Sequence, residues 1–319
     1  MKDLIVYNLE SMYKKSKCNK EPWKAKAYMD AVRLFQRIEG DIRTEEDIKE
    51  LKLGKSIKEK VLYMIENKTN LPQIQGDEDS STPLFETIDE LAKIHNIGIV
   101  KAKELAEVHG IRSFEELKQN MHLLNDKQKQ GVMYHHDILQ RIPRSEMLKH
   151  DQFIETIMRT HYLEISMFSL VGSYRRNQSE SGDIDLIICS KGSFTLESLI
   201  HTMTKNKYIK DDGIFALGKK KFMGMCSLPD GCTSRRIDIL LCPPLEYPFA
   251  LLYFTGSKEY NIKMREQAQR MGYRLNEKGV WDNSLQKVKN LKTEEDIFKF
   301  LSIKFVEPSD RIVENYQEL

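Results

Sequence analysis

The sequence predicts an α+β protein, with two helical regions followed by a mixed-sheet region and a small α/β region at the C-terminal end. Apolar side chains recur at helical spacing up to about residue 140, and short β-rich runs bounded by glycine and serine follow from about residue 164. The chain has 319 residues, whereas a single hydrophobic core rarely grows past roughly 250–300 residues. Several domains are therefore expected.

The helical part of the chain is predicted in two regions. Residues 1–75 form the first, because apolar side chains recur there at helical intervals, as at Ala31 and Phe35. The acidic and small residues of 76–82 predict a linker. Residues 83–143 form the second helical region, which a proline closes.

The rest of the chain is predicted to combine sheet and helix. Residues 144–244 are expected to form a mixed sheet, and residues 245–319 a smaller α/β region. Strands are predicted at about residues 165–171, 184–188 and 236–241, and helices at about 196–205 and 261–271.

The bulk properties exclude several classes of protein. The formal net charge is only +2, which argues against a surface coated in positive charge, although local basic patches can still bind nucleic acid. The five cysteines are odd in number and lack zinc-site spacing, so we expect no disulfide framework and no structural zinc. The N-terminus is too polar for a signal peptide, and no apolar run approaches the roughly 20 residues of a membrane span. A soluble, intracellular protein without membrane contact is expected.

The acidic residues of two predicted strands are the strongest sign of chemistry. Asp183 and Asp185 flank the apolar Ile184, so alternation along a strand turns both carboxylates to one face. Asp238 lies on a later apolar strand. If the two strands are neighbours, three carboxylates converge and can hold two Mg²⁺ ions, the arrangement used for in-line phosphoryl transfer. The alternative is a β-turn with exposed acids.

A glycine–serine pair precedes these acids and predicts a phosphate-binding turn. Gly172 and Ser173 follow an apolar strand at the start of a helix, where glycine permits close approach and the hydroxyl can donate to phosphate. Arg176 adds a charge-assisted donor. Found together with the three carboxylates, this turn makes exposed turn acids an unfavourable explanation.

At these residues the chain resembles the nucleotidyltransferases, and nearly its whole length resembles the family X DNA polymerases. The resemblance extends to the segments RIPR at 141–144, KFMG at 221–224, YFTGS at 253–257 and EPSDR at 307–311. It implies a helical lyase-like domain, a helix-hairpin-helix subdomain, a nucleotidyltransferase palm and a nucleotide-selecting subdomain. The cofactor implied is a pair of Mg²⁺ ions, with Mn²⁺ as a substitute, held by Asp183, Asp185 and Asp238.

The resemblance also assigns residues to the incoming nucleotide. Tyr253, Phe254 and Gly256 would select deoxynucleotides, Asn261 would contact the base, and Arg265 would reach the template strand. The remaining nucleotide-binding candidates are Gly172, Ser173, Arg176, Ser181 and Gly182. Lys258 departs from the family pattern, which has an acid there, so its contact with the base is an open question.

Further residues are implied in DNA binding. The segment around Gly98 resembles the helix-hairpin-helix turn that binds a DNA phosphate with Na⁺ or K⁺. Asn96 stands in it where the family has its first glycine. Because asparagine tolerates a left-handed backbone, we expect this turn to survive. The DNA-binding candidates are Lys24, Tyr28, Gly54, Lys55, Gly98, Lys101, Lys221 and Arg236.

The first helical region resembles a 5′-deoxyribose phosphate lyase domain. That chemistry needs a lysine amine that attacks the sugar aldehyde, and Lys60 stands at the family's position. Ser56 and Pro72 replace lysines that bind phosphate in the family. A site that anchors a 5′-phosphate without catalysis is therefore the alternative.

Three hypotheses for the whole chain follow. The first is a DNA-directed DNA polymerase that fills short gaps in base excision repair, a monomer acting on gapped or nicked double-stranded DNA and dNTPs. The second is a template-independent nucleotidyltransferase, and the third is a DNA-binding module without catalysis. Asn261 and Arg265 favour the use of a template, and dependence on metal would separate either enzyme from a pure binder.

Overall fold

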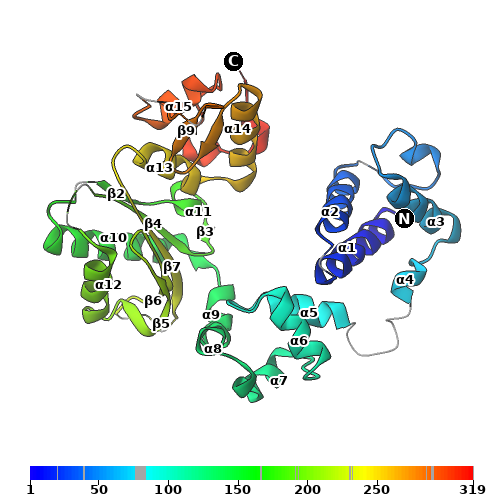
Figure 1. The fold of residues 1–319 in the computed structure, drawn as a ribbon, viewed down its shortest axis with the longest axis horizontal. Coiled ribbons are helices and arrows are strands. Elements are labelled where there is room, and N and C mark those ends of the chain that lie inside the picture. Colours follow the sequence, from blue (N-terminus) through cyan, green and yellow to red (C-terminus); the bar gives the residue numbers. More distant parts are fainter. Residues whose placement is uncertain are drawn as a thin grey trace. The chain divides into compact units, whose positions relative to one another are not determined.

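The computed structural model consists of two compact units, residues 1–133 and 134–319, which we describe separately. The described residues are 1–19, 21–38, 40–75, 84–165, 167–190, 192, 194–229, 231, 233–284, 286–288 and 291–318. The predicted linker over 76–82 lies outside them. The predicted α+β class is confirmed, because helices alone build the first unit and a mixed sheet with helices builds most of the second (Figure 1).

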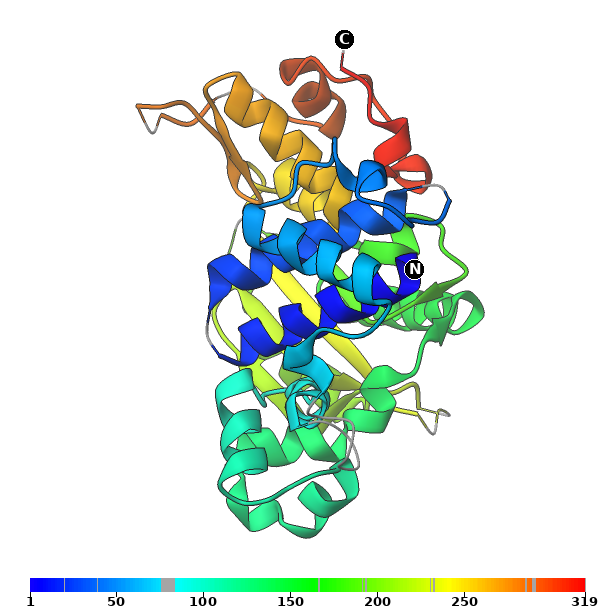
Figure 2. The ribbon, with the colours of Figure 1, turned by 90° about the vertical axis from the view of Figure 1, so that its right-hand side faces the viewer.

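The first unit begins with a helical bundle. Its elements are α1 (Lys2–Cys18), α2 (Pro22–Arg37), η1 (Glu46–Ile48), α3 (Lys55–Asn67) and α4 (Pro72–Gln75). Figures 1 and 2 both show α1 and α2 side by side. Leu9, Phe35 and Met64 are fully buried in their common core, so one face of each helix holds the bundle together.

The same unit continues with a second group of short helices. They are α5 (Leu84–Ala92), α6 (Ile99–Glu107), α7 (Phe114–Gln119), η2 (Met121–Leu123) and α8 (Asp126–Met133). Leu91, Leu105 and Leu117 lie in their core. A Cβ at Gly131 would lie 1.8 Å from the carbonyl oxygen of His95, so a glycine is required where α8 passes the turn between α5 and α6.

The second unit is built around a five-stranded sheet. Its strands are β2 (Met167–Leu170), β4 (Ile184–Cys189), β5 (Ile209–Leu217), β6 (Lys221–Cys226) and β7 (Arg235–Cys242), in the order β2-β4-β7-β6-β5. Only β4 and β7 are parallel, and their neighbours are antiparallel, so the sheet is mixed as predicted. A separate short pair is formed by β1 (Ile142–Pro143) and β3 (Glu180–Ser181).

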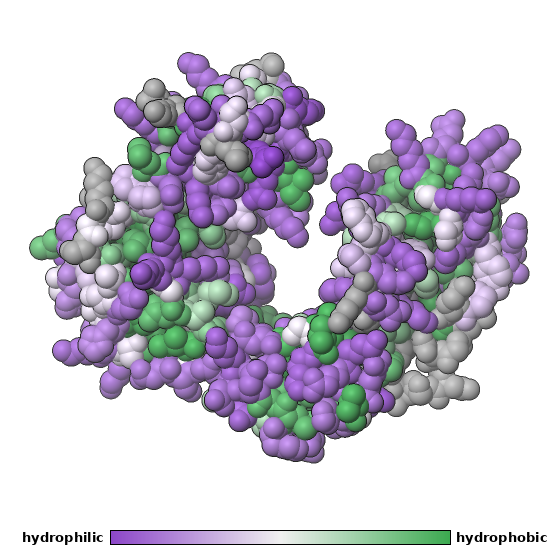
Figure 3. Space-filling model, in the orientation of Figure 1, coloured by the Kyte–Doolittle hydropathy of each residue, from purple (hydrophilic) through white to green (hydrophobic). Residues whose placement is uncertain are grey.

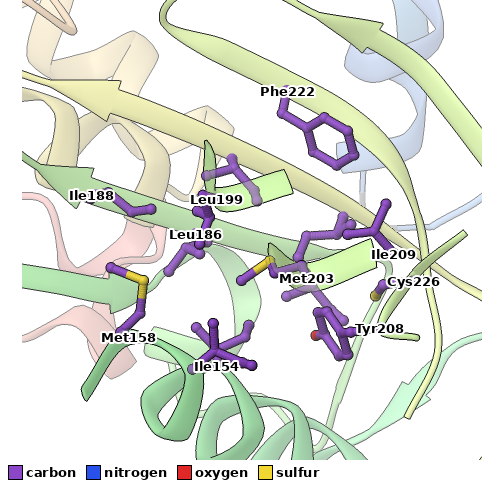
Figure 4. Packing of buried hydrophobic residues seen from close by; sticks show 14 of the residues in the cluster. Ile154, Met158, Leu186, Ile188, Leu199, Met203, Tyr208, Ile209, Phe222 and Cys226 are labelled. Carbon is purple, nitrogen blue, oxygen red and sulfur yellow. The ribbon is translucent and has the colours of Figure 1, made fainter. Parts of the chain in front are cut away.

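Helices cover this sheet and complete its core. They are α9 (His135–Leu139), α10 (Arg144–His161), α11 (Gly172–Arg175) and α12 (Leu196–Lys205). Figure 4 shows Met158 of α10 and Met203 of α12 among the buried side chains around Leu186 and Ile188 of β4. This packing fixes the central strands, which carry the acidic residues.

Two strands of the sheet, β5 and β6, were not predicted from the sequence. The pair Asp211-Asp212 and the following Gly213 are untypical of a strand interior, and the register between β5 and β6 shifts at two points. Gly213 is required because a Cβ there would lie 2.8 Å from the Cβ of Met225. Irregular pairing thus hides these strands from a pattern of simple alternation.

The second unit ends in a smaller α/β subdomain with its own core. Its elements are α13 (Tyr247–Thr255), α14 (Lys258–Arg270), β8 (Arg274–Asn276), β9 (Gly279–Trp281), α15 (Glu294–Phe300), η3 (Pro308–Asp310) and η4 (Val313–Asn315). Tyr260, Met264 and Phe298 are buried in it. The helix predicted over 261–271 begins earlier, at Lys258, because the Ser257 side chain accepts a hydrogen bond from the Tyr260 amide and caps it.

A group of three charges, two of them buried and that of Arg175 partly buried, joins this subdomain to α11. Arg175 donates to both carboxylate oxygens of Glu294 at 3.1 and 2.7 Å, and Arg311 donates to Glu294 at 2.7 Å. Burial raises the pKa of the Glu294 carboxyl, but the two guanidinium groups outweigh this effect and hold it below its ordinary value. Arg311 is fully buried and also lies against the ring of Phe298.

Polar side chains dominate the face of each unit drawn in Figure 3. The most exposed large apolar side chains are Trp23, Leu245 and Leu163, which stand apart in the sequence. Exposed apolar residues that are scattered singly are normal for folded proteins. Among the described helices, none combines the length and apolar character needed to cross a membrane.

Candidate active site

Two parallel strands in the interior of the sheet, β4 and β7, bring the three predicted carboxylates together. Asp185 of β4 is the register partner of Asp238 of β7, and Asp183 lies directly before β4. Ile184 between the two aspartates is fully buried, as alternation predicts. The neighbouring position of the two strands, on which the sequence argument depended, is therefore present.

Asp183 and Asp185 lie in surroundings that disfavour their negative charge. Burial, with the nearby charges of Asp183 and Asp238, raises the pKa of Asp185 to about 7. Burial also raises the pKa of Asp183, although the Arg236 guanidinium opposes this shift. The site thus concentrates acidic groups at a cost that a bound cation would offset.

Two basic side chains contact these acids. Arg236 Nη2 lies 3.1 Å from Asp238 Oδ2 and 3.5 Å from Asp183 Oδ2. Lys221 Nζ lies 3.7 Å from Asp238 Oδ2. The sequence assigned both side chains to DNA, and in this structure they neutralise part of the acidic cluster.

The acidic cluster fits divalent metal ions by its chemistry. Its donors are carboxylate oxygens, which suit hard cations such as Mg²⁺. As the side chains stand, no three or more His, Cys, Asp or Glu residues of the described ranges are grouped to hold a metal ion. Arg236 contacts both Asp183 and Asp238, so metal binding requires its guanidinium to withdraw from them.

The glycine–serine turn lies against the same carboxylates. Gly172 has φ +59°, and a Cβ there would lie 2.3 Å from Asp185 Oδ2. Any other residue would therefore collide with the carboxylate as well as strain the backbone. The sequence predicted the turn between strand and helix, and α11 begins at Gly172 as expected.

A cavity of about 710 Å³ opens beside this turn and contains most of the predicted nucleotide-binding residues. Its lining is Arg141, Gly172, Ser173, Arg176, Gly182, Asp183, Asp185, Tyr253, Phe254, Gly256, Lys258, Asn261, Ile262 and Arg265. Ser181 and Asp238 do not line it, and Ser181 is buried. The size is typical of a small-molecule site, because ligand pockets span roughly 300–1,000 Å³.

Three lining residues were not assigned from the sequence. Lys258 was noted for its departure from the family pattern but was given no role, and Ile262 could have been found from helical spacing, since it lies three residues before Arg265 on the same helix. Arg141 belongs to the segment at 141–144 that contributes to the family resemblance, but nothing in the sequence assigned it to the site. It reaches Gly182 because β1 pairs with β3, and a Cβ at Gly182 would lie 2.9 Å from Arg141 Nη1.

Contacts within the protein hold the polar side chains along this cavity in place. Asn261 Nδ2 donates to the Tyr253 carbonyl oxygen at 2.7 Å, and the Arg265 guanidinium lies 4.8 Å from the centre of the Tyr253 ring. Arg176 Nη1 donates to the Thr255 carbonyl oxygen at 2.6 Å. These bonds order the side chains before a ligand arrives, which reduces the entropy lost on binding.

The first unit contains a separate basic pocket of about 580 Å³. Its lining is Met12, Lys15, Asn19, Glu21, Lys24, Ala27, Tyr28, Gly54, Lys55, Ser56, Ile57 and Lys60. All five residues that the sequence assigned to this region lie in it, and Lys60 Nζ donates to Ser56 Oγ at 2.8 Å. Lys15, Asn19 and Glu21 were missed, because α1 and the segment after it approach α3 only in the folded chain.

The predicted helix-hairpin-helix turn has the expected backbone. Asn96 has φ +65°, so the expectation that asparagine adopts the left-handed conformation is confirmed. Gly98 is the N-cap of α6. Lys101 Nζ lies 2.7 Å from Glu104, so part of its charge is already compensated within the helix.

Sequence comparisons agree with this architecture. Residues 141–244 match the model of the DNA polymerase beta palm, residues 250–312 that of the DNA polymerase beta thumb, and residues 89–139 that of the fingers domain of DNA polymerase lambda. The matched segments follow one another along the chain, with the carboxylates inside the palm. The chain belongs to the family X DNA polymerases, and this membership implies dependence on divalent metal ions.

Two similar proteins are both named DNA polymerase lambda. The protein from Rattus norvegicus is 26% identical over 328 residues, which cover 96% of this chain and 56% of that protein. The protein from Arabidopsis thaliana is 26% identical over 312 residues, covering 89% of this chain and 57% of that protein. The chain thus spans little more than half the length of these relatives.

Proposed function

We propose that this protein is a DNA-directed DNA polymerase that fills short gaps in base excision repair by two-metal nucleotidyl transfer. The observation that carries the proposal is the register pairing of Asp185 with Asp238, with Asp183 and the Gly172 turn beside them. The named relatives are DNA polymerases, which supports this reading over a DNA-binding module without catalysis. We further propose a monomer that acts on gapped or nicked double-stranded DNA with dNTPs.

We assign a role to each region of the chain. Residues 1–75 are the lyase-like domain that binds a 5′-phosphate, and residues 83–143 are the helix-hairpin-helix subdomain that binds DNA with the help of Na⁺ or K⁺. Residues 76–82 are the linker between them. Residues 144–244 are the catalytic palm, and residues 245–319 select the nucleotide.

The carboxylates would hold two Mg²⁺ ions, or Mn²⁺ as a substitute. Asp183 and Asp185 would bind both ions, and Asp238 one of them. When bound, such ions lower the pKa of the primer 3′-hydroxyl and neutralise charge on the triphosphate. Asp238 is the proposed acceptor of the hydroxyl proton. Lys221 and Arg236, which now contact the acids, would be released towards the DNA backbone.

The cavity would hold the incoming nucleotide along its length. Gly172 permits the triphosphate to approach the backbone, while Ser173 and Arg176 donate to its oxygens. Ser181 and Gly182 shape the segment next to the acids. Tyr253, Phe254 and Gly256 would exclude a 2′-hydroxyl, Asn261 would meet the base, and Arg265 the template strand. The contacts within the protein that order Asn261 and Arg265 support this assignment.

Primer extension at a one-nucleotide gap with a 5′-phosphate tests the proposal. With magnesium and single dNTPs, we expect insertion of the nucleotide that matches the template, and none by the Asp238→Ala variant. Insertion that ignores the template would instead identify a template-independent transferase. Gap binding without any incorporation would contradict the enzyme assignment altogether.

We also propose 5′-deoxyribose phosphate lyase activity for the first unit, with Lys60 as the nucleophile. The basic pocket supports it, because it places the Lys60 amine beside Lys24 and Lys55, whose charges attract a 5′-phosphate. Lys24, Lys55 and Tyr28 would hold the 5′-phosphate, and Gly54 the adjacent backbone. Ser56, at the position of a family lysine, accepts a hydrogen bond from Lys60 and would orient its amine.

Borohydride trapping on DNA with a 5′-deoxyribose phosphate end should detect this lyase. We expect a covalent adduct with the unmodified protein and its loss, by roughly 100-fold or more, in Lys60→Ala, because the nucleophile is absent. Lys58→Ala is the matched control, since Lys58 lies on the same helix but does not line the pocket. DNA binding without an adduct in the unmodified protein would identify a 5′-phosphate anchor only.

A further inference from the structure

Lys258 is a cation of the nucleotide cavity that the family pattern does not explain. It is the first residue of α14 and lines the cavity together with Arg141, Arg176 and Arg265. Arg141 is paired with Glu180, Arg176 binds a backbone carbonyl, and Arg265 lies on the Tyr253 ring. Within the described residues, the ammonium group of Lys258 has no hydrogen bond or ion pair of its own.

The position of Lys258 is unfavourable for folding. The N-terminus of a helix carries partial positive charge, so a lysine in the first turn is electrostatically disfavoured and an acid is preferred. α14 has 13 residues and is therefore long enough for the dipoles of its peptide groups to add up, so this effect applies to it. Lys258 is exposed to solvent, so its charge needs no protein partner. Its place beside the cavity in the first turn of α14 lets it serve a ligand without adding to the stability of the fold.

The backbone places Lys258 at the end of the cavity that holds Arg176. A Cβ at Gly256 would lie 3.0 Å from Arg176 Nη1 and 3.4 Å from the Lys258 amide nitrogen, so these groups surround the same turn. Asn261 and Arg265 follow one and two helical turns further along α14. The first turn of α14, which carries Lys258, therefore lies beside Arg176, and Arg265 lies two turns further along the helix.

We propose that Lys258 is a further nucleotide-binding residue whose ammonium group contacts the triphosphate of the incoming nucleotide. This inference rests on the proposed function of the cavity and adds a determinant of nucleotide affinity. An ammonium group is a compact charge that binds phosphate oxygens well. Because all four dNTPs share the triphosphate, the contact strengthens binding of each nucleotide alike and leaves the choice of base to other residues.

The test compares Lys258→Gln with the unmodified full chain in single-nucleotide gap filling. We expect KM to rise about 10-fold for each of the four dNTPs, the loss of one charge-assisted contact, while kcat changes by less than about 2-fold. The dissociation constant of inorganic tripolyphosphate, measured by calorimetry with magnesium, should rise by a similar factor. Lys258→Arg should stay within about 3-fold of the unmodified protein in both measurements.

Two controls separate this role from a structural one. Lys263→Gln removes a lysine from the same helix that is paired with Glu266 and does not line the cavity, so its KM should be unchanged. The melting temperature of Lys258→Gln should equal or exceed that of the unmodified protein, since a disfavoured charge is removed.

An unchanged KM and tripolyphosphate affinity in Lys258→Gln, or a KM effect confined to one base, would overturn the inference. If the unmodified protein binds dNTPs and tripolyphosphate without incorporating nucleotides, the proposed polymerase function fails. The calorimetric comparison still decides the role of Lys258 in that case, because it does not depend on turnover.

Discussion

Replacement of Asp185 by asparagine is expected to abolish nucleotide incorporation while making the metal-free protein more stable. The carboxylate is a proposed ligand of both metal ions, and losing about 4 kcal/mol of their transition-state stabilisation lowers the rate roughly 1,000-fold. Burial of this carboxyl, together with the charges of Asp183 and Asp238, raises the pKa of Asp185 to about 7. Asparagine keeps the size of the side chain and removes the repulsion.

The sign of the stability effect follows from the pKa. An acid whose pKa is higher in the folded chain than its ordinary value of 3.8 costs stability as pH rises from about 4, and the full cost is reached above about 7. At pH 8 without metal we expect Asp185→Asn to raise the melting temperature of the second unit by roughly 2–8 °C. This gain should disappear near pH 4, where the native carboxyl is already neutral.

Thermal unfolding at pH 4 and pH 8, together with gap filling, measures both effects. Asp211→Asn is the matched control, since Asp211 is exposed on β5 of the same sheet and outside the cavity. The control should leave incorporation and melting temperature unchanged. Retained incorporation in Asp185→Asn would remove the metal-binding role of this carboxylate, and a lower melting temperature at pH 8 would contradict the electrostatic argument.

Replacement of Glu294 by alanine is expected to destabilise the second unit by about 3–5 kcal/mol, because removing one partner of a buried ion pair leaves uncompensated charge. Arg311 is fully buried and Arg175 largely so, and both bond to the Glu294 carboxylate. Each guanidinium would keep only its bonds to neighbouring oxygens. The expected loss is therefore large for a single substitution.

Denaturant unfolding of the full chain measures this loss. Glu295→Ala is the control, because Glu295 is the next residue on α15 but is exposed. It should change the free energy of unfolding by less than about 0.5 kcal/mol. Equal stabilities for the two variants would show that water replaces the lost carboxylate and that the buried charges do not hold the subdomain to α11.

The acidic residues of the site, and their order along the chain, could be predicted because each is marked by its neighbours in the sequence. Asp183 and Asp185 follow strand alternation, and Gly172 marks a turn whatever the rest of the chain does. The convergence of Asp238 remained conditional, since strand neighbours are decided by the whole sheet. Hydrophobic periodicity predicted most of the helices, but it failed for β5 and β6. The register shifts between these two strands break the alternation of apolar and polar side chains by which a strand is predicted.

The contacts that tune the site could not be predicted in this way. Arg236 looked like a free cation for DNA, yet it contacts Asp238 on its own strand and Asp183, which directly precedes the neighbouring strand β4. Arg141 reaches the cavity through a two-residue strand pair that no pattern indicates. Side chains that meet across elements depend on tertiary packing, which overrides local preference.

Gly172 and Asp185 are expected to constrain each other's substitution in evolution. The missing side chain leaves the space that Asp185 Oδ2 occupies, so the two residues share one volume. A lineage that keeps the acid is expected to keep the glycine, whereas loss of the acid would remove the collision at residue 172 and leave only the backbone strain of a positive φ. The pair is therefore epistatic, and in mutational libraries the intolerance of one position should depend on the identity of the other.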